Sequence, residues 1–196
     1  ILAQLYDHRK LLISMVGLLA ALNLAGHSTV DMYPTFLQRK WDLSPTTRSA
    51  VSALALTGTL FGALLVGYLS DRIGRRRAMA IAFGLAILIV PVWAFAPTLA
   101  LTIAAAWIMQ FLVQGAWGVI PAHLAELAPN SVRGSLPGFA YQMGALASSG
   151  IVYLQALAAE RMPYSNAMAI TAGSALVLAA IASCLGQERK GRDLAE

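Results

Sequence analysis

Four polar side chains recur at every fourth position inside an otherwise apolar stretch, namely Asn23, His27, Asp31 and Thr35. A step of four residues along an α-helix turns the direction by about 40°, so the four would share one slowly turning stripe. His27 and Asp31 stand four apart and can meet directly on a helix. Because histidine titrates nearest to neutral pH, this pair has the chemistry to take up and release a proton.

The cost of placing such groups in a membrane favours a functional role for the stripe. An ionisable group at mid-bilayer costs at least about 2.5–3.5 kcal/mol, and such groups usually face a cavity or a partner. Two other interpretations remain open from the residues alone. Asp31 stands shortly before Pro34, and water near the end of the segment would lower its cost. His27 on its own would also serve as a hydrogen bond between helices.

The elements that must position these residues are indicated by composition. The chain of 196 residues is 58% hydrophobic and 12% charged, whereas a soluble domain carries about 25% charged residues. A bilayer core of about 30 Å needs about 20 apolar residues per helix. Six stretches qualify, and they cover residues 11–37, 47–70, 77–97, 99–127, 135–159 and 164–187. We therefore predict an all-α fold, a transmembrane six-helix bundle, with a cytoplasmic tail at 188–196.

The basic residues alternate between the two ends of the predicted helices. One set of connections holds most of them: Arg9, Lys10, Arg72, Arg75, Arg76, Arg77, Arg133, Arg189, Lys190 and Arg192. The other set holds Arg39, Lys40, Arg48 and Arg161. The positive-inside rule then predicts an integral protein of the cell (inner) membrane with both termini in the cytoplasm. The net charge of +5 follows from this asymmetry, so no nucleic-acid partner is predicted.

A second pattern is the basic loop "GYLSDRIGRRR", residues 67–77, which follows the second predicted helix. Gly67 suits a close helix crossing and Gly74 suits a tight turn. Asp71 can accept hydrogen bonds from the arginines that follow it, or from a helix N-terminus. This combination predicts a charge latch at the membrane surface.

The loop resembles the signature loop of the major facilitator superfamily, which follows the second and the eighth helix of its members. The resemblance implies twelve helices in two six-helix halves, with the substrate site between them, and this chain covers one half. It also implies a conformational latch formed by Gly67, Asp71, Arg72, Gly74, Arg75, Arg76, Glu126 and Arg133. From the residues alone, Glu126 can equally be a helix-end carboxylate in the headgroup region. His123 is interpreted as a packing or interfacial histidine.

The branch of the family is indicated by two helices. The spaced Asn, His, Asp and Thr resemble the seventh helix of carboxylate–proton symporters of the lactate and pyruvate type and of the related sialate symporters. The segment "YQMGALASS", which contains Gln142, resembles their eleventh helix, and "GQERKGRDL" is similar to their C-terminal tails. By this resemblance the chain is the C-terminal half and lacks its N-terminal partner half. Val30 and Ala145 depart from the pattern, which has a polar residue and an Asn there.

Residues and resemblance together predict proton-coupled symport of a small carboxylate by alternating access in a lipid bilayer. Asp31 and His27 would carry the proton, and Asn23, His27, Thr35 and Gln142 would bind the anion. The alternative is a facilitator of another substrate class: a sugar, a sialate, an aromatic acid or a drug. An enzyme is not predicted, since the His/Asp pair lacks a second His or Cys at ligand spacing. No metal or cofactor is predicted either. A purely structural scaffold protein is also not predicted, because it would not need a titratable pair inside the membrane.

Overall fold

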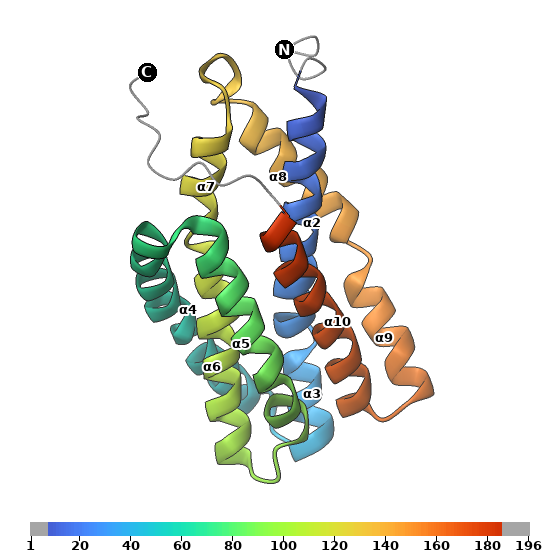
Figure 1. Ribbon diagram of the computed structural model, residues 1–196. Helices are drawn as coiled ribbons and strands as arrows, with labels where there is room; N and C mark the ends of the chain where they lie inside the picture. Colours follow the sequence, from blue (N-terminus) through green and yellow to red (C-terminus); the bar gives the residue numbers. More distant parts are fainter. Residues whose placement is uncertain (1–7, 186–196) are drawn as a thin grey trace.

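Helices form the whole framework of residues 8–185, the part of the chain that the computed structural model describes (Figure 1). Their bounds are α2 (Arg9–Val30), α3 (Tyr33–Trp41), α4 (Pro45–Ile73), α5 (Arg75–Phe95), α6 (Leu99–Trp117), α7 (Ile120–Leu127), the short 3₁₀ helix η1 (Asn130–Val132), α8 (Leu136–Ser148), α9 (Ile151–Arg161) and α10 (Tyr164–Leu185). The predicted all-α fold is confirmed. The expected tail at 188–196 lies outside the described residues.

These helices form six rods, because three pairs of segments follow one another with only a short interruption (Figure 1). Among residues 8–185, five segments have the length and hydropathy to cross a membrane: Arg9–Trp41, Pro45–Ile73, Arg75–Phe95, Leu99–Leu127 and Tyr164–Leu185. The remaining rod was expected as one helix over residues 135–159. It is divided at Ser149 and Gly150 into α8 and α9, and each part is shorter than the roughly 20 residues that span a bilayer.

Proline accounts for the interruption of the first rod at Asp31 and Met32. Pro34 has no backbone N–H, so it cannot donate to the carbonyl four residues earlier, at Val30. It is tolerated because it falls in the first turn of α3, where backbone donors lack helical partners anyway. The expected continuous helix over residues 11–37 is thus two helices. Asn23, His27 and Asp31 stay on the α2 side of the break, while Thr35 belongs to α3.

Glycines set the tight crossing of α4 on α6. A Cβ added at Gly62 would overlap the carbonyl oxygen of Phe111, and one at Gly115 would lie 2.9 Å from the carbonyl carbon of Gly62. Small residues allow such approach where lipid gives helices no hydrophobic drive to associate. The crossing expected at Gly67 is absent, since a Cβ there meets nothing within 4 Å. Gly74 does form the expected turn, with φ of 103° between α4 and α5.

The crossing gives a first testable prediction, for the variant Gly62→Ala. Its new methyl group meets backbone that cannot move aside, so we expect a loss of about 1–3 kcal/mol of stability, as for overpacked cores. Thermal unfolding in detergent measures the effect. Gly67→Ala is the matched control on the same helix, because its methyl group enters open space. Equal losses of melting temperature in the two variants would contradict the crossing.

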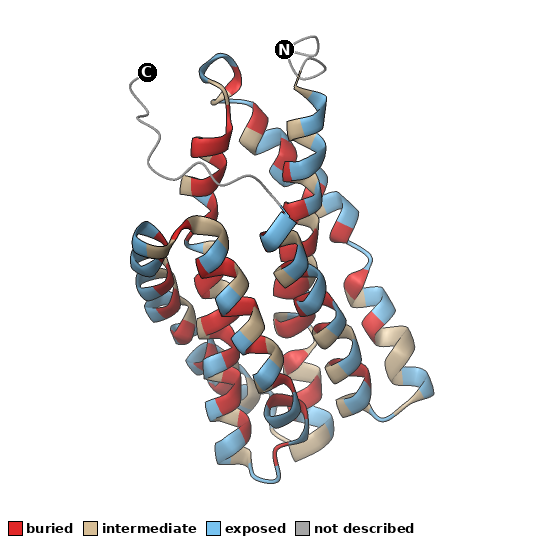
Figure 2. Cartoon of the chain, viewed as in Figure 1, coloured by how far each residue is buried: buried red, intermediate tan, exposed pale blue. Residues whose placement is uncertain are grey.

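Many large apolar side chains on the helices are exposed. Figure 2 shows exposed stretches alternating with buried ones along the helices. Leu64 on α4 is 75% exposed and Leu88 on α5 is 70% exposed. Exposed apolar surface of this extent marks contact with lipid or with further protein. Together with the spanning helices, it shows an integral membrane protein.

The two ends of the bundle differ in charge. The start of α2, the α4–α5 turn and the α7–α8 connection lie toward the same end, the upper one in Figure 1, and we call it the basic end. Within residues 8–185 it carries Arg9, Lys10, Arg72, Arg75, Arg76, Arg77 and Arg133. The opposite end carries Arg39, Lys40, Arg48 and Arg161. The basic end is therefore the one that the positive-inside rule assigns to the cytoplasm.

Candidate functional site

A cleft of about 250 Å³ opens beside the last turns of α2. Its lining comes from three helices. The residues are Asn23, Gly26, His27, Val30 and Asp31 from α2 and its C-terminal cap, Gln114 and Trp117 from α6, and Tyr141 from α8. His27 and Asp31 therefore face open space, while Asn23 lines the cleft from a nearly buried position.

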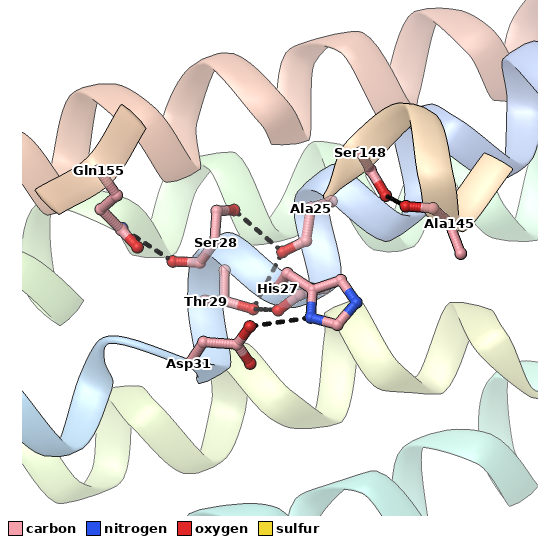
Figure 3. A network of polar contacts seen from close by, with 9 residues as sticks. Ala25, His27, Ser28, Thr29, Asp31, Ala145, Ser148 and Gln155 are labelled. Atoms are coloured by element: carbon pink, nitrogen blue, oxygen red, sulfur yellow. Dashed lines mark hydrogen bonds and ion pairs between the residues drawn. The ribbon is translucent and has the colours of Figure 1, made fainter. Parts of the chain in front are cut away.

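His27 and Asp31 both line this cleft and contact each other. Nδ1 of His27 lies 2.9 Å from Oδ2 of Asp31, one helical turn further on (Figure 3). The imidazole side chain is 50% exposed and the carboxylate side chain 35% exposed. This degree of exposure lets solvent reach both groups through the cleft. The imidazole is thus solvent-accessible. Its Nδ1 contacts the carboxylate of Asp31, and its Nε2 does not.

The other three predicted binding residues are not all in the cleft. Asn23 lines it, although its side chain is nearly buried and its Nδ2 donates to the Leu19 carbonyl at 2.8 Å. Thr35 lies beyond the break in α3, and Gln142 is exposed on α8, so neither contributes to the lining. The structure brings together Asn23, His27 and Asp31, and it leaves Thr35 and Gln142 apart from them.

Two side chains that sequence reasoning missed bring N–H groups to the floor of the cleft. A Cβ placed on Gly26 would lie 3.4 Å from Nε1 of Trp117 and 4.0 Å from Nε2 of Gln114. Two neutral donors therefore approach Gly26, five residues before Asp31. Tyr141 packs edge-on against Trp117, with ring centroids 6.1 Å apart, and holds the indole in place. The only feature of the sequence that pointed to these two residues is that Gln114 is polar and lies inside an apolar stretch.

At the basic end, Arg75 joins three helices. Its Nη2 and Nε donate to Oε1 of Glu126 in α7 at 3.0 and 3.2 Å, and its Nη1 donates to Asp71 at the end of α4. Nη1 also lies 2.7 Å from the Ser70 hydroxyl. Glu126 is only 7% exposed, so its charge needs this partner. One planar guanidinium thus serves two carboxylates at once, which a lysine could not do in the same geometry.

The other arginines of the predicted latch make separate contacts. Arg72 donates to the hydroxyl of Tyr68 and lies over its ring, 4.5 Å from the centroid. Arg76 donates through Nε to the Ser183 carbonyl at 3.1 Å and so ties α5 to α10. Arg133 caps η1 in the α7–α8 connection. His123 is buried in α7 and lines an apolar groove, away from the cleft. Among residues 8–185 there is no cluster of three or more metal-ligating side chains.

A sequence model described as Major Facilitator Superfamily matches residues 13–194. The chain belongs to the major facilitator superfamily. Among relatives in this superfamily, it is 29% identical over 194 residues to the "Carboxylic acid transporter protein homolog" of Saccharomyces cerevisiae, covering 92% of this chain and 31% of that protein. It is 35% identical over 132 residues to the "Glucose transporter GlcP" of Staphylococcus epidermidis, covering 65% of this chain and 29% of that protein.

The facilitator fold is also seen in solved structures. The chain superposes on the inward-open xylose transporter XylE from E. coli with a TM-score of 0.68 at 21% identity, covering 90% of this chain and 48% of that one. It spans less than a third of the two curated relatives and about half of XylE. The predicted all-α facilitator fold is therefore confirmed, with five helical segments among residues 8–185 long and apolar enough to cross a membrane. The relatives are transporters, which favours transport over an enzymatic activity.

Proposed function

We propose that this chain is the C-terminal half of a carrier that couples proton movement to the transport of a small carboxylate. The observation that carries the proposal is the contact between His27 and Asp31 in a solvent-accessible cleft of an otherwise apolar bundle. A charged group inside such a bundle lowers its stability, so we expect the pair to have a functional role. The yeast relative, whose name describes a carboxylic acid transporter homolog, supports the choice of substrate class.

The proton step follows from the chemistry of the pair. With its Nδ1 proton directed at Asp31, neutral His27 presents a lone pair on Nε2 that can accept a proton from the cleft. Before protonation the pair carries one negative charge, which repels a carboxylate. After protonation the pair is neutral overall, and the anion can approach. Proton binding therefore precedes anion binding, and this order couples the two.

The anion would be held by neutral donors. Nε1 of Trp117 and Nε2 of Gln114 both approach Gly26 at the cleft, and in this proposal they donate to the carboxylate group of the anion. The ring face of Tyr141 and the indole would pack against the short carbon skeleton of the acid. The missing half would close the cleft from the other side and complete the binding site.

Alternating access requires two states with a switch between them. In the proposed scheme, the Arg75 contacts with Asp71 and Glu126 stabilise one of these states at the basic end, which would face the cytoplasm. A latch of this kind biases an equilibrium of a few kcal/mol. Breaking and reforming it accompanies each transport cycle.

A sugar carrier is the second candidate, because GlcP is described as a glucose transporter and XylE as a xylose transporter. The experiment that separates the two uses the complete carrier in proteoliposomes, with an inwardly directed proton gradient. Labelled acetate, lactate and pyruvate are compared with labelled glucose and xylose. The proposal expects carboxylate uptake that accelerates as the outside is acidified. Uptake of glucose or xylose with no uptake of any carboxylate would contradict the proposal and support a sugar carrier.

The place of the anion gives a prediction for Gly26→Ala. The new methyl group fits without a clash but occupies the space in front of the two N–H groups. We expect the KM for carboxylate to rise about ten-fold while kcat changes little, as when binding common to substrate and transition state is lost. Gly17→Ala, on the same helix and with nothing within 4 Å of the new Cβ, is the control. An unchanged KM in Gly26→Ala would show that the anion does not bind beside Gly26.

A further inference from the structure

The broken end of α2 receives hydrogen bonds from two buried glutamines on other helices. Nε2 of Gln110 in α6 donates to the Thr29 carbonyl at 3.3 Å, and Nε2 of Gln155 in α9 donates to the Ser28 carbonyl at 3.1 Å. Figure 3 shows the second contact beside the His27–Asp31 pair. Gln110 is 4% exposed and Gln155 is fully buried. Neither side chain lines the cleft.

These hydrogen bonds replace backbone donors that the end of α2 lacks. Ser28 and Thr29 lie in the last turn of α2, where the carbonyls of a helix have lost their regular backbone donors. Ser28 and Thr29 are fully buried, so water does not replace those donors, and a buried carbonyl left without a donor is destabilising. The two side-chain amides supply the donors that the interrupted backbone cannot.

The orientation of the Gln155 amide is fixed by its neighbours. The Thr171 hydroxyl in α10 donates to the Ala167 carbonyl at 2.7 Å, so it accepts from Nε2 of Gln155 at 2.9 Å. The Ser28 carbonyl can only accept. Both amide hydrogens are therefore matched to acceptors on two different helices, and α9 is tied to the end of α2 and to α10.

We propose that Gln110 and Gln155 are positioning residues for the proton site. By holding the carbonyls of the last turn of α2, they fix the direction in which Asp31 leaves the helix and so its contact with His27. The inference rests on the proposed function only for its effect on transport. Its effect on the backbone at the break is independent of which substrate is carried.

The backbone effect is tested by amide hydrogen exchange over residues 28–36 in the complete carrier. Gln155→Met and Gln110→Met keep the side-chain length and remove the donors. We expect exchange about three- to ten-fold faster in both, from the measured strength of hydrogen bonds between membrane helices. Gln155→His, which restores an N–H donor, recovers part of the protection. Thr171→Val removes the contact to α10 but keeps the one to Ser28, and should exchange at nearly the wild-type rate. Wild-type exchange in both Met variants overturns the proposal.

The effect on transport separates positioning from a merely structural role. Proton-driven uptake is compared with substrate exchange at equal pH, which needs no net proton movement. In Gln155→Met we expect driven uptake to fall at least about three-fold more than exchange. An equal fall in both would leave Gln155 a structural residue and overturn the positioning role. If the proposed function itself is wrong, wild-type uptake shows no proton dependence, and that result is visible before any glutamine variant is made.

Discussion

Asp31→Asn is expected to reduce proton-driven carboxylate uptake by the complete carrier by at least about 100-fold, the usual range for loss of a proton-transfer group. The amide has nearly the shape of the carboxylate but cannot ionise, so the pair loses the negative charge that protonation of His27 offsets. Substrate exchange at equal pH should persist, because it needs no net proton transfer. Uptake under a proton gradient and exchange are measured side by side in proteoliposomes.

Asp42→Asn is the matched control for this prediction. Asp42 is also a carboxylate next to the first rod, but it is exposed and caps α3 with a left-handed φ of 49°. Asparagine tolerates that conformation as well as aspartate does, so the fold is undisturbed. We expect wild-type uptake. Undiminished uptake and coupling in Asp31→Asn would remove Asp31 from the mechanism.

The second large effect is expected for Arg75→Met, which leaves Glu126 charged and buried in α7 without its partner. Removing one member of a buried pair costs about 3–5 kcal/mol. The side chains of Arg75 and Glu126 are 14% and 9% exposed, so solvent screens little of this cost. Thermal unfolding in detergent and uptake should both be severely impaired.

Two further variants make this prediction specific. Arg75→Met combined with Glu126→Met replaces the pair by apolar side chains and should recover most of the stability, because no charge is then left buried alone. It should not recover transport, because the proposed latch is then absent. Arg77→Gln removes an exposed charge from the same helix start and should change stability by less than about 0.5 kcal/mol. A double variant as unstable as Arg75→Met would show that the pair is not the cause.

The helices were predictable from sequence because each needs only about 20 apolar residues in a row. Their interruptions were not, since hydropathy continues through them. Pro34 is a local signal for the first break, but Ser149 and Gly150 divide the fifth rod without any proline. The assumption of one straight helix over 11–37 is also what placed Thr35 on the same stripe as Asp31.

The site was predictable only where its contacts are local. His27 meets Asp31, and Arg75 meets Asp71, because both pairs stand four apart on a helix or at its end. The partner of Glu126 is Arg75, 51 residues away; no spacing along the chain indicates this contact, and only the family resemblance placed both residues in one predicted latch.

The rest of the cleft depends on how other helices are rotated. Gln114 and Trp117 reach it because α6 presents that side to α2, and Gln142 misses it because α8 turns that side outward. Hydropathy does not fix such rotation in a bundle whose outer faces are as apolar as its interior.

The most direct test of the central claim follows protons themselves. Carboxylate is added to proteoliposomes that hold the complete carrier and an internal pH-sensitive dye, with equal pH on both sides and protein-free liposomes as the baseline. The account predicts internal acidification that rises with the amount of carboxylate taken up, and baseline behaviour in Asp31→Asn. Carboxylate entry with no proton movement above the baseline would contradict it.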